Sequence, residues 1–198
     1  MATPYTNTSH HLAQRAEFLV NDDLARFKKY VVQATGSTVN WDTVAIDRQL
    51  HSLLAVQTKH TMLREDEIYR LSCPVDRLSA GGREPGLYAY VLFDRSELLV
   101  GKFIFHEHEL HRYFFPEEYG LKDSPIGYSR GTKKDSEIRS IDLSRNATGE
   151  LVTDDLDLSH YKDDVGWKRA FTMVREAAEM REYNYYRLMA LNKSALAA

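Results

Sequence analysis

The segment from residue 87 to residue 105 constrains the fold most, because its local signals alone predict a β-hairpin. Residues 87–93 and 98–105 are rich in aromatic and β-branched side chains, which favour strands. The four residues between them, Asp-Arg-Ser-Glu at 94–97, are charged and polar and are typical of a turn. The sequence therefore predicts two antiparallel strands in this segment.

A second hairpin and one further strand are predicted elsewhere in the chain. The sequence Asn-Ala-Thr-Gly at 146–149 is typical of a turn and has strand-forming residues on both sides, which predicts a hairpin over residues 137–153. Tyr69, Leu71 and Cys73 alternate with other residues before a proline, a pattern that predicts a strand. The sheet is therefore expected to be mostly antiparallel.

Three segments show apolar residues at steps of three or four, which predicts helices. Ser9 is the expected cap of the first helix, which ends near Gly36. Asn40 is the expected cap of a second helix that runs to about Lys59, and a third helix is expected to start at Gly166. The apolar positions on which these predictions rest are Leu12, Ala16, Val20, Leu24, Phe27, Val31, Ile46, Leu50, Leu53, Leu54, Phe171, Val174, Ala178, Tyr185 and Leu188.

The order of these elements predicts an α+β fold, in which a mostly antiparallel sheet packs with two N-terminal helices and one long C-terminal helix. No glycine fingerprint of a Rossmann fold or a P-loop is present. The length predicts a single globular domain over residues 1–198, with short flexible ends at 1–8 and 193–198.

Composition narrows the classes of partner and compartment. The 26 Lys and Arg residues are outnumbered by 29 Asp and Glu residues, so binding to nucleic acid would need a local basic patch. Cys73 is the single cysteine, so no disulfide can form within the chain, and a cytoplasmic location is expected, or the host cytoplasm if the protein is viral. No apolar stretch approaches the roughly 20 residues of a membrane helix, so no membrane partner is expected.

The densest group of reactive side chains is His-Glu-His-Glu-Leu-His at 106–111. His106 and His108 would share a face of a strand, and His108 and His111 would share a face of a helix. These three histidines are candidate ligands of a divalent metal, the one cofactor that the sequence suggests. The spacing is similar to the His-x-His-x-Asp-His motif of the metallo-β-lactamase fold, with Leu110 in place of the aspartate. The alternative, solvated histidines that pair with glutamates, stays open.

The first hairpin resembles the signature hairpin of the GIY-YIG nucleases, through Gly-Leu-Tyr at 86–88 and Leu-Val-Gly at 99–101. The resemblance implies a metal-assisted phosphodiesterase or nuclease in which Tyr88 activates or positions the attacking water and an arginine stabilises the phosphate. Leu99 replaces the second tyrosine of the signature. Arg112 matches the family's arginine only with a three-residue insertion.

Two further groups are candidate binding residues. The basic segment 128–134 is predicted to form a compact turn in which Arg130, Lys133 and Lys134 bind phosphate groups of a nucleic acid, although interleaved acidic residues also suit a solvated loop.

On the C-terminal helix, Tyr183, Tyr186 and Arg187 are of the types enriched at protein interfaces. They suggest a protein partner or self-association.

The leading hypothesis from sequence is a small bacterial or viral accessory or regulatory protein. It would bind a macromolecular partner through the C-terminal helix and the aromatic, histidine-rich edge of the sheet. The alternative is the metal-assisted phosphodiesterase or nuclease. The sequence leaves open whether the chain is an enzyme.

Overall fold

The computed structural model describes residues 5–27, 29–33, 42–47, 52–74, 86–120, 128–133, 136–153 and 156–196. These residues form three α-helices, two short 3-10 helices and ten strands. In chain order the elements are α1 (Tyr5–Arg26), β1 (Tyr30–Gln33), β2 (Thr43–Asp47), β3 (Ser52–Met62), β4 (Tyr69–Pro74), β5 (Gly86–Phe93), β6 (Leu99–His106), α2 (Glu107–Phe114), η2 (Pro116–Tyr119), β7 (Tyr128–Lys133), β8 (Ser136–Arg145), β9 (Leu151–Thr153), β10 (Leu156–Asp157), η3 (Ser159–Tyr161) and α3 (Asp163–Leu196).

The strands form two sheets, and the predicted α+β class is confirmed. The first sheet has the order β1-β2-β3-β5-β6, and the second has the order β10-β9-β8-β4 with β7 also paired to β8. Strands β3 and β5 pair in parallel, and every other strand pair in the described residues is antiparallel. The sheet structure is therefore mostly antiparallel, as expected.

Both predicted hairpins are present. Strands β5 and β6 pair from Leu87 opposite His106 to Phe93 opposite Leu99. Strands β8 and β9 pair through Ser144 and Val152, and the turn between them contains Gly149 at φ +85°, a conformation that favours glycine. The strand predicted around Leu71 is confirmed as β4.

The second N-terminal helix predicted from Asn40 to Lys59 is wrong, because strands β2 and β3 occupy most of that segment. Thr43 and Ala45 are buried while Ile46 is exposed, which is the period of a strand with one covered face. The third α-helix of the fold is instead the short α2. The expected cap Asn40 lies outside the described residues.

The first helix also ends earlier than predicted. Helix α1 begins at Tyr5, so Ser9 lies inside it, and it ends at Arg26. The segment around Val31 forms strand β1, which pairs with β2.

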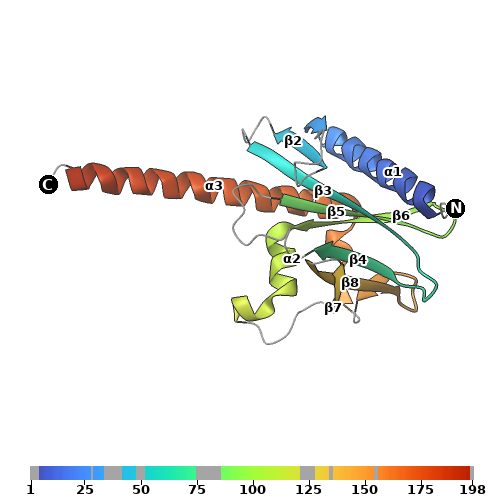
Figure 1. The fold of residues 1–198 in the computed structure, drawn as a ribbon. Helices are drawn as coiled ribbons and strands as arrows, with labels where there is room; N and C mark the ends of the chain where they lie inside the picture. The colour runs from blue at the N-terminus through green and yellow to red at the C-terminus, as the bar shows by residue number, and fades with distance from the viewer. Residues whose placement is uncertain are drawn as a thin grey trace.

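Two buried clusters hold the layers together. Helix α1 and the first part of α3 cover one face of the first sheet, and the second sheet and α2 cover the other (Figure 1). The first cluster is Leu12, Ala16, Val20, Leu24, Ala45, Leu54, Val56, Leu87, Ala89, Val91, Phe93, Ile104, Trp167, Ala170 and Val174. The second cluster contains Tyr69, Leu71, Cys73, Tyr88, Tyr90, Leu92, Phe103, Phe105, Leu110, Phe114, Ile141, Leu143, Leu151, Leu158 and Tyr161.

A buried ionic cluster joins α1, β6 and α3. Asp23 is 2% exposed and forms an ion pair with Lys102 Nζ. Trp167 Nε1 donates to Asp23 Oδ2 at 2.8 Å, and Arg26 Nη2 lies 2.6 Å from Asp23 Oδ1. Arg26 also reaches Asp164 at the start of α3, at 2.9 Å. One carboxylate therefore binds groups from three elements.

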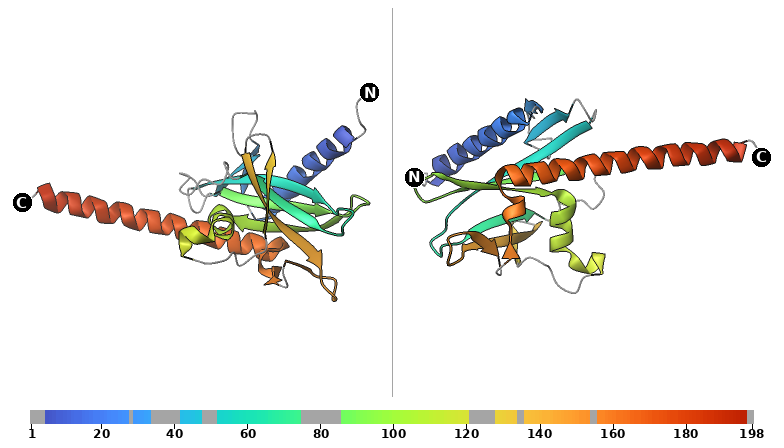
Figure 2. Two further views of the ribbon diagram at one scale, coloured as in Figure 1. Left: turned by 60° about the horizontal axis from the view of Figure 1, so that its bottom comes forward. Right: turned by 180° about the vertical axis from the view of Figure 1, so that it is seen from behind.

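Helix α3 has 34 residues and is about 51 Å long at 1.5 Å per residue. Its C-terminal part, drawn in red, extends beyond both sheets in all three views (Figures 1 and 2). Helices α1 and α3 include residues 5–8 and 193–196, which the sequence predicted as flexible ends. None of the helices, as far as they are described, is both long and apolar enough to cross a membrane.

Candidate active site

His106 caps helix α2. Its Nδ1 accepts a hydrogen bond from the backbone N–H of His108 at 3.2 Å, and its own backbone N–H donates to Glu109 Oε2 at 3.0 Å. This reciprocal pair is a capping box, which satisfies N–H groups at the start of a helix. The local sequence pattern around His106 is therefore explained by helix initiation.

The three histidines do not form the predicted metal site. His108 is exposed, whereas His111 is buried and stacks on Phe115 with ring centroids 4.7 Å apart. Burial lowers the pKa of His111, although Glu118 lies 3.8 Å from its Nε2. Within the described ranges, no three His, Cys, Asp or Glu side chains are grouped to hold a metal ion.

Tyr88 lies in the core between the two sheets and is only 2% exposed. Its neighbour Cys73 is also fully buried, and burial raises the pKa of that thiol to about 11. Arg112 is exposed on α2. At this depth Tyr88 cannot contact a substrate, so the role that the GIY-YIG resemblance implies for it does not fit the structure.

The segment predicted as a basic turn is strand β7, in which Arg130 lies opposite Arg139 of β8. Lys133 ends the strand, and Lys134 lies outside the described residues. The side chains of Arg130 and Lys133 are not described, so phosphate binding by this segment stays a prediction.

Tyr183, Tyr186 and Arg187 lie in the C-terminal half of α3. Their side chains are likewise outside the description. Binding of a protein partner or self-association through this helix therefore stays a prediction.

A group that sequence reasoning missed lies at the start of β2. Asp42 directly precedes that strand, and its Oδ2 accepts hydrogen bonds from Gln57 Nε2 and from the backbone N–H of Thr58, the latter at 2.8 Å. The backbone N–H of Asp42 donates to the carbonyl of Val56 at 3.1 Å. Two hydrogen bonds to its carboxylate and one from its backbone thus hold Asp42 against strand β3.

A second carboxylate approaches from helix α1. Glu17 is half-buried, and its pKa is raised first by burial and then by the negative charge of Asp42, while His10 opposes the shift. A carboxylate whose pKa is raised by burial and by a second carboxylate is a recurring feature of catalytic sites.

Lys59 adds a positive charge on the same strand. It follows Gln57 by two residues, so both side chains leave β3 on one face. In the parallel pairing Gln57 lies beside Tyr88 and Lys59 beside Tyr90. The pKa of His60 is lowered first by burial and then by the charge of Lys59.

Glu17, Asp42 and Gln57, here called the Asp42 group, combine two carboxylates and a carboxamide. Their oxygens are hard ligands of the kind that Mg²⁺ and Mn²⁺ prefer. Lys59 is not part of this group, because it lies beside Tyr90 of the cluster between the two sheets, where its charge acts on Cys73. This combination suits reactions at phosphate groups better than the buried Tyr88 does.

The sequence carried a signal for this group that the helical interpretation of residues 40–59 obscured. In a helix, Asp42 and Gln57 would be four turns apart, whereas antiparallel pairing of β2 with β3 places Thr43 opposite Val56. An aspartate directly before a strand, and the alternation Gln57-Thr58-Lys59 in the next one, were the readable features.

The raised pKa of Glu17 predicts a pH-dependent gain in stability for Glu17→Gln. Above the raised pKa the folded protein holds this carboxylate charged at a cost, and the cost is relieved as the pH falls toward the ordinary value for glutamate. We therefore expect the variant to melt about 1–2 °C above wild type at pH 8, with no difference near pH 4. Thermal unfolding followed by circular dichroism measures this, with exposed Asp22→Asn on the same helix as the control. An equal loss of stability at every pH would contradict the prediction.

No protein-family model and no curated protein matches the chain. Among solved structures, the chain is similar to a bacterial homing endonuclease, at 17% sequence identity and a TM-score of 0.48. The match covers 92% of this chain and 99% of that one. At this identity and TM-score the likeness does not by itself assign an activity.

Proposed function

We propose that the chain is a metal-assisted phosphodiesterase or nuclease and that the Asp42 group performs the reaction. The observation that carries this proposal is the fixed position of Asp42, which bonds to Gln57 and Thr58 on β3 while its charge raises the pKa of Glu17 on α1. A carboxylate that is both held by hydrogen bonds and close to a second carboxylate is preorganised to bind a cation.

Magnesium is the cation that this donor set fits. Mg²⁺ in phosphoryl-transfer sites commonly takes one or two carboxylates from the protein and completes its shell with water and phosphate oxygens. Asp42 and Glu17 supply the carboxylates, and Gln57 holds Asp42 in place by donating from its Nε2 to Asp42 Oδ2. When bound, such an ion polarises the phosphate and lowers the pKa of a bound water.

Glu17 and Asp42 are proposed to act together on the cation. Glu17 is half-buried on α1, and its pKa is raised first by burial and then by the charge of Asp42, so a bound divalent cation would stabilise both carboxylates in the charged form. The residues proposed here replace Tyr88, Arg112 and the three histidines as the catalytic set of a nuclease.

The experiment that tests the proposal is cleavage of plasmid DNA and of labelled DNA oligonucleotides by the full chain. We expect cleavage with Mg²⁺ or Mn²⁺ and none with EDTA. Glu17→Gln should reduce the rate by about 100-fold or more, the scale for loss of one group that acts on the transition state. Asp22→Asn, which removes an exposed carboxylate of the same helix, is the matched control and should cleave normally. Absence of cleavage with every divalent cation, or normal cleavage by Glu17→Gln, would refute the proposal.

A further inference from the structure

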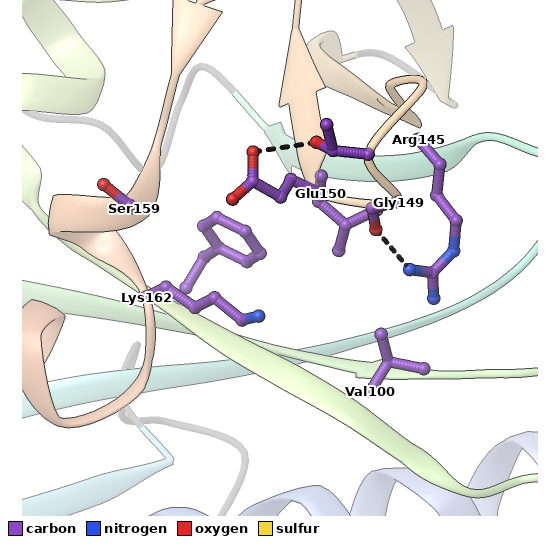
Figure 3. Close-up of a pocket in the computed structure, with 9 residues that line it drawn as sticks. Val100, Arg145, Gly149, Glu150, Ser159 and Lys162 are labelled. Carbon is purple, nitrogen blue, oxygen red and sulfur yellow. Dashed lines mark hydrogen bonds between the residues drawn. The ribbon is translucent and has the colours of Figure 1, made fainter.

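A pocket of about 430 Å³ opens on the side of the molecule where the β8–β9 turn faces β6 and η3 (Figure 3). Arg145, Glu150 and Lys162 contribute charged side chains, and Val100 and Phe103 contribute apolar walls. The Asp42 group does not line it. The pocket therefore needs an explanation of its own.

Two cations face this pocket without a carboxylate partner. In Figure 3 the amino end of Lys162 points into the space, and the guanidinium of Arg145 is directed toward the same space. Arg145 Nη1 donates to the carbonyl of Gly149 at 2.7 Å, and no ion pair joins either cation to a carboxylate in the described part of the chain. Glu150 is turned to the loop, where its Oε2 accepts from Thr148 Oγ1 at 3.2 Å.

The backbone around Lys162 explains why its charge stays exposed to the pocket. A Cβ at Gly101 would lie 3.0 Å from Lys162 Cε, so the absence of a side chain there lets the lysine lie across β6. The adjacent Asp163 is engaged elsewhere, because its Oδ1 accepts from the backbone N–H of Lys102 at 2.8 Å. Within the described residues Lys162 forms no ion pair with Asp163, and its amino end points into the pocket (Figure 3).

We propose that this pocket binds a phosphate group carried by a nucleotide, either free or within a nucleic-acid strand. Arg145 and Lys162 with Glu150 carry a net charge of about +1, which matches one phosphodiester. Arginine binds phosphate through its planar fork of N–H groups, and lysine adds a point charge. The volume is that of pockets that hold small ligands, so the sugar or base can pack on Val100. Of these two sources of the phosphate, only the nucleic-acid strand rests on the proposed nuclease function.

The test is binding by the full chain in EDTA, so that no cleavage occurs. Fluorescence anisotropy with labelled single-stranded and duplex DNA of about 20 nucleotides measures strand binding, and competition by thymidine monophosphate measures free nucleotide. We expect Lys162→Met and Arg145→Met each to weaken binding by about tenfold and to reduce the slope of log affinity against log salt by about 1. The exposed Lys168→Met removes the same charge outside the pocket and should change neither.

A third variant keeps the charge and moves it. Gly101→Ala should press on the aliphatic chain of Lys162 and weaken binding by about threefold, with circular dichroism and melting as checks of the fold.

The outcomes separate the two sources of phosphate. If Lys162→Met and Arg145→Met lose only the competition by thymidine monophosphate, the pocket binds free nucleotides. If they lose DNA binding as well, the pocket binds a strand. Equal effects of Lys162→Met and Lys168→Met, or no binding of either ligand by wild type, would overturn the inference. Weaker binding by Lys162→Met from a wild type that does not cleave DNA would refute only the nuclease proposal.

Discussion

Asp42→Asn is expected to reduce DNA cleavage by about 100-fold to 1,000-fold while the thermal unfolding midpoint stays within about 2 °C of wild type. Asparagine keeps an oxygen that can accept from Gln57 Nε2 or from the N–H of Thr58, so most of the local hydrogen bonding survives. The variant loses the negative charge, which is what a divalent cation needs from this position. Initial rates at saturating Mg²⁺, together with melting curves, measure both effects.

The charge at position 42 has a second consequence that separates this explanation from simple loss of structure. The negative charge of Asp42 contributes to the raised pKa of Glu17, so Asp42→Asn should lower that pKa toward its ordinary value. The stability gain of Glu17→Gln at pH 8 should accordingly shrink in the Asp42→Asn background. Asp66→Asn, at an exposed aspartate outside the group, is the control for cleavage. Wild-type cleavage by Asp42→Asn would rule out this residue as a cation ligand.

Asp23→Ala is expected to lower the free energy of unfolding by about 3–5 kcal/mol, the scale for removing one partner of a buried ion pair. Asp23 forms an ion pair with Lys102 and accepts a hydrogen bond from the indole N–H of Trp167, and it is almost fully buried. Lys102 is only 9% exposed, so without the carboxylate its charge would be buried and uncompensated. Trp167 would also lose its hydrogen-bond acceptor. Urea unfolding followed by tryptophan fluorescence gives the free energy.

Two further variants separate the ion pair from general damage at this junction. The double variant Asp23→Leu with Lys102→Met removes both charges, so it should recover much of the stability that Asp23→Leu alone loses. Asp22→Ala removes an exposed carboxylate one residue earlier and should cost less than about 0.5 kcal/mol. A loss below 1 kcal/mol for Asp23→Ala, or no recovery in the double variant, would mean that the pair does not hold α1, β6 and α3 together.

The amino-acid sequence determined those parts of the fold that depend on neighbours in the chain. The hairpin of β5 and β6 followed from two strand-forming segments and a polar turn, and the hairpin of β8 and β9 followed from a turn that ends in Gly149. Helix α3 followed from its apolar spacing. In each case the interacting residues lie within a few positions of one another, so local propensity is enough to specify the element.

Residues 40–59 show where local reasoning fails. Ile46 and Leu54 are spaced as a helix requires, yet the same residues fit two strands joined by a turn. Pairing decided between these structures, because β3 bonds β2 on one edge and β5 on the other, and Leu54 packs under α1. A periodicity within the segment carries no information about backbone hydrogen bonds to a partner more than 30 residues away.

The candidate sites show the same difference between local and long-range contacts. The histidine cluster is the most conspicuous local pattern, and its contacts are local, since His106 and Glu109 cap their own helix. The Asp42 group joins Glu17 of α1, the residue before β2 and Gln57 of β3, so only the folded chain brings these side chains together. The sequence alone thus determined the hairpins and the long helix through short-range propensity. The tertiary structure decided which polar residues share a site, because α1 and the β2–β3 pairing bring them together across 15 to 40 residues of chain.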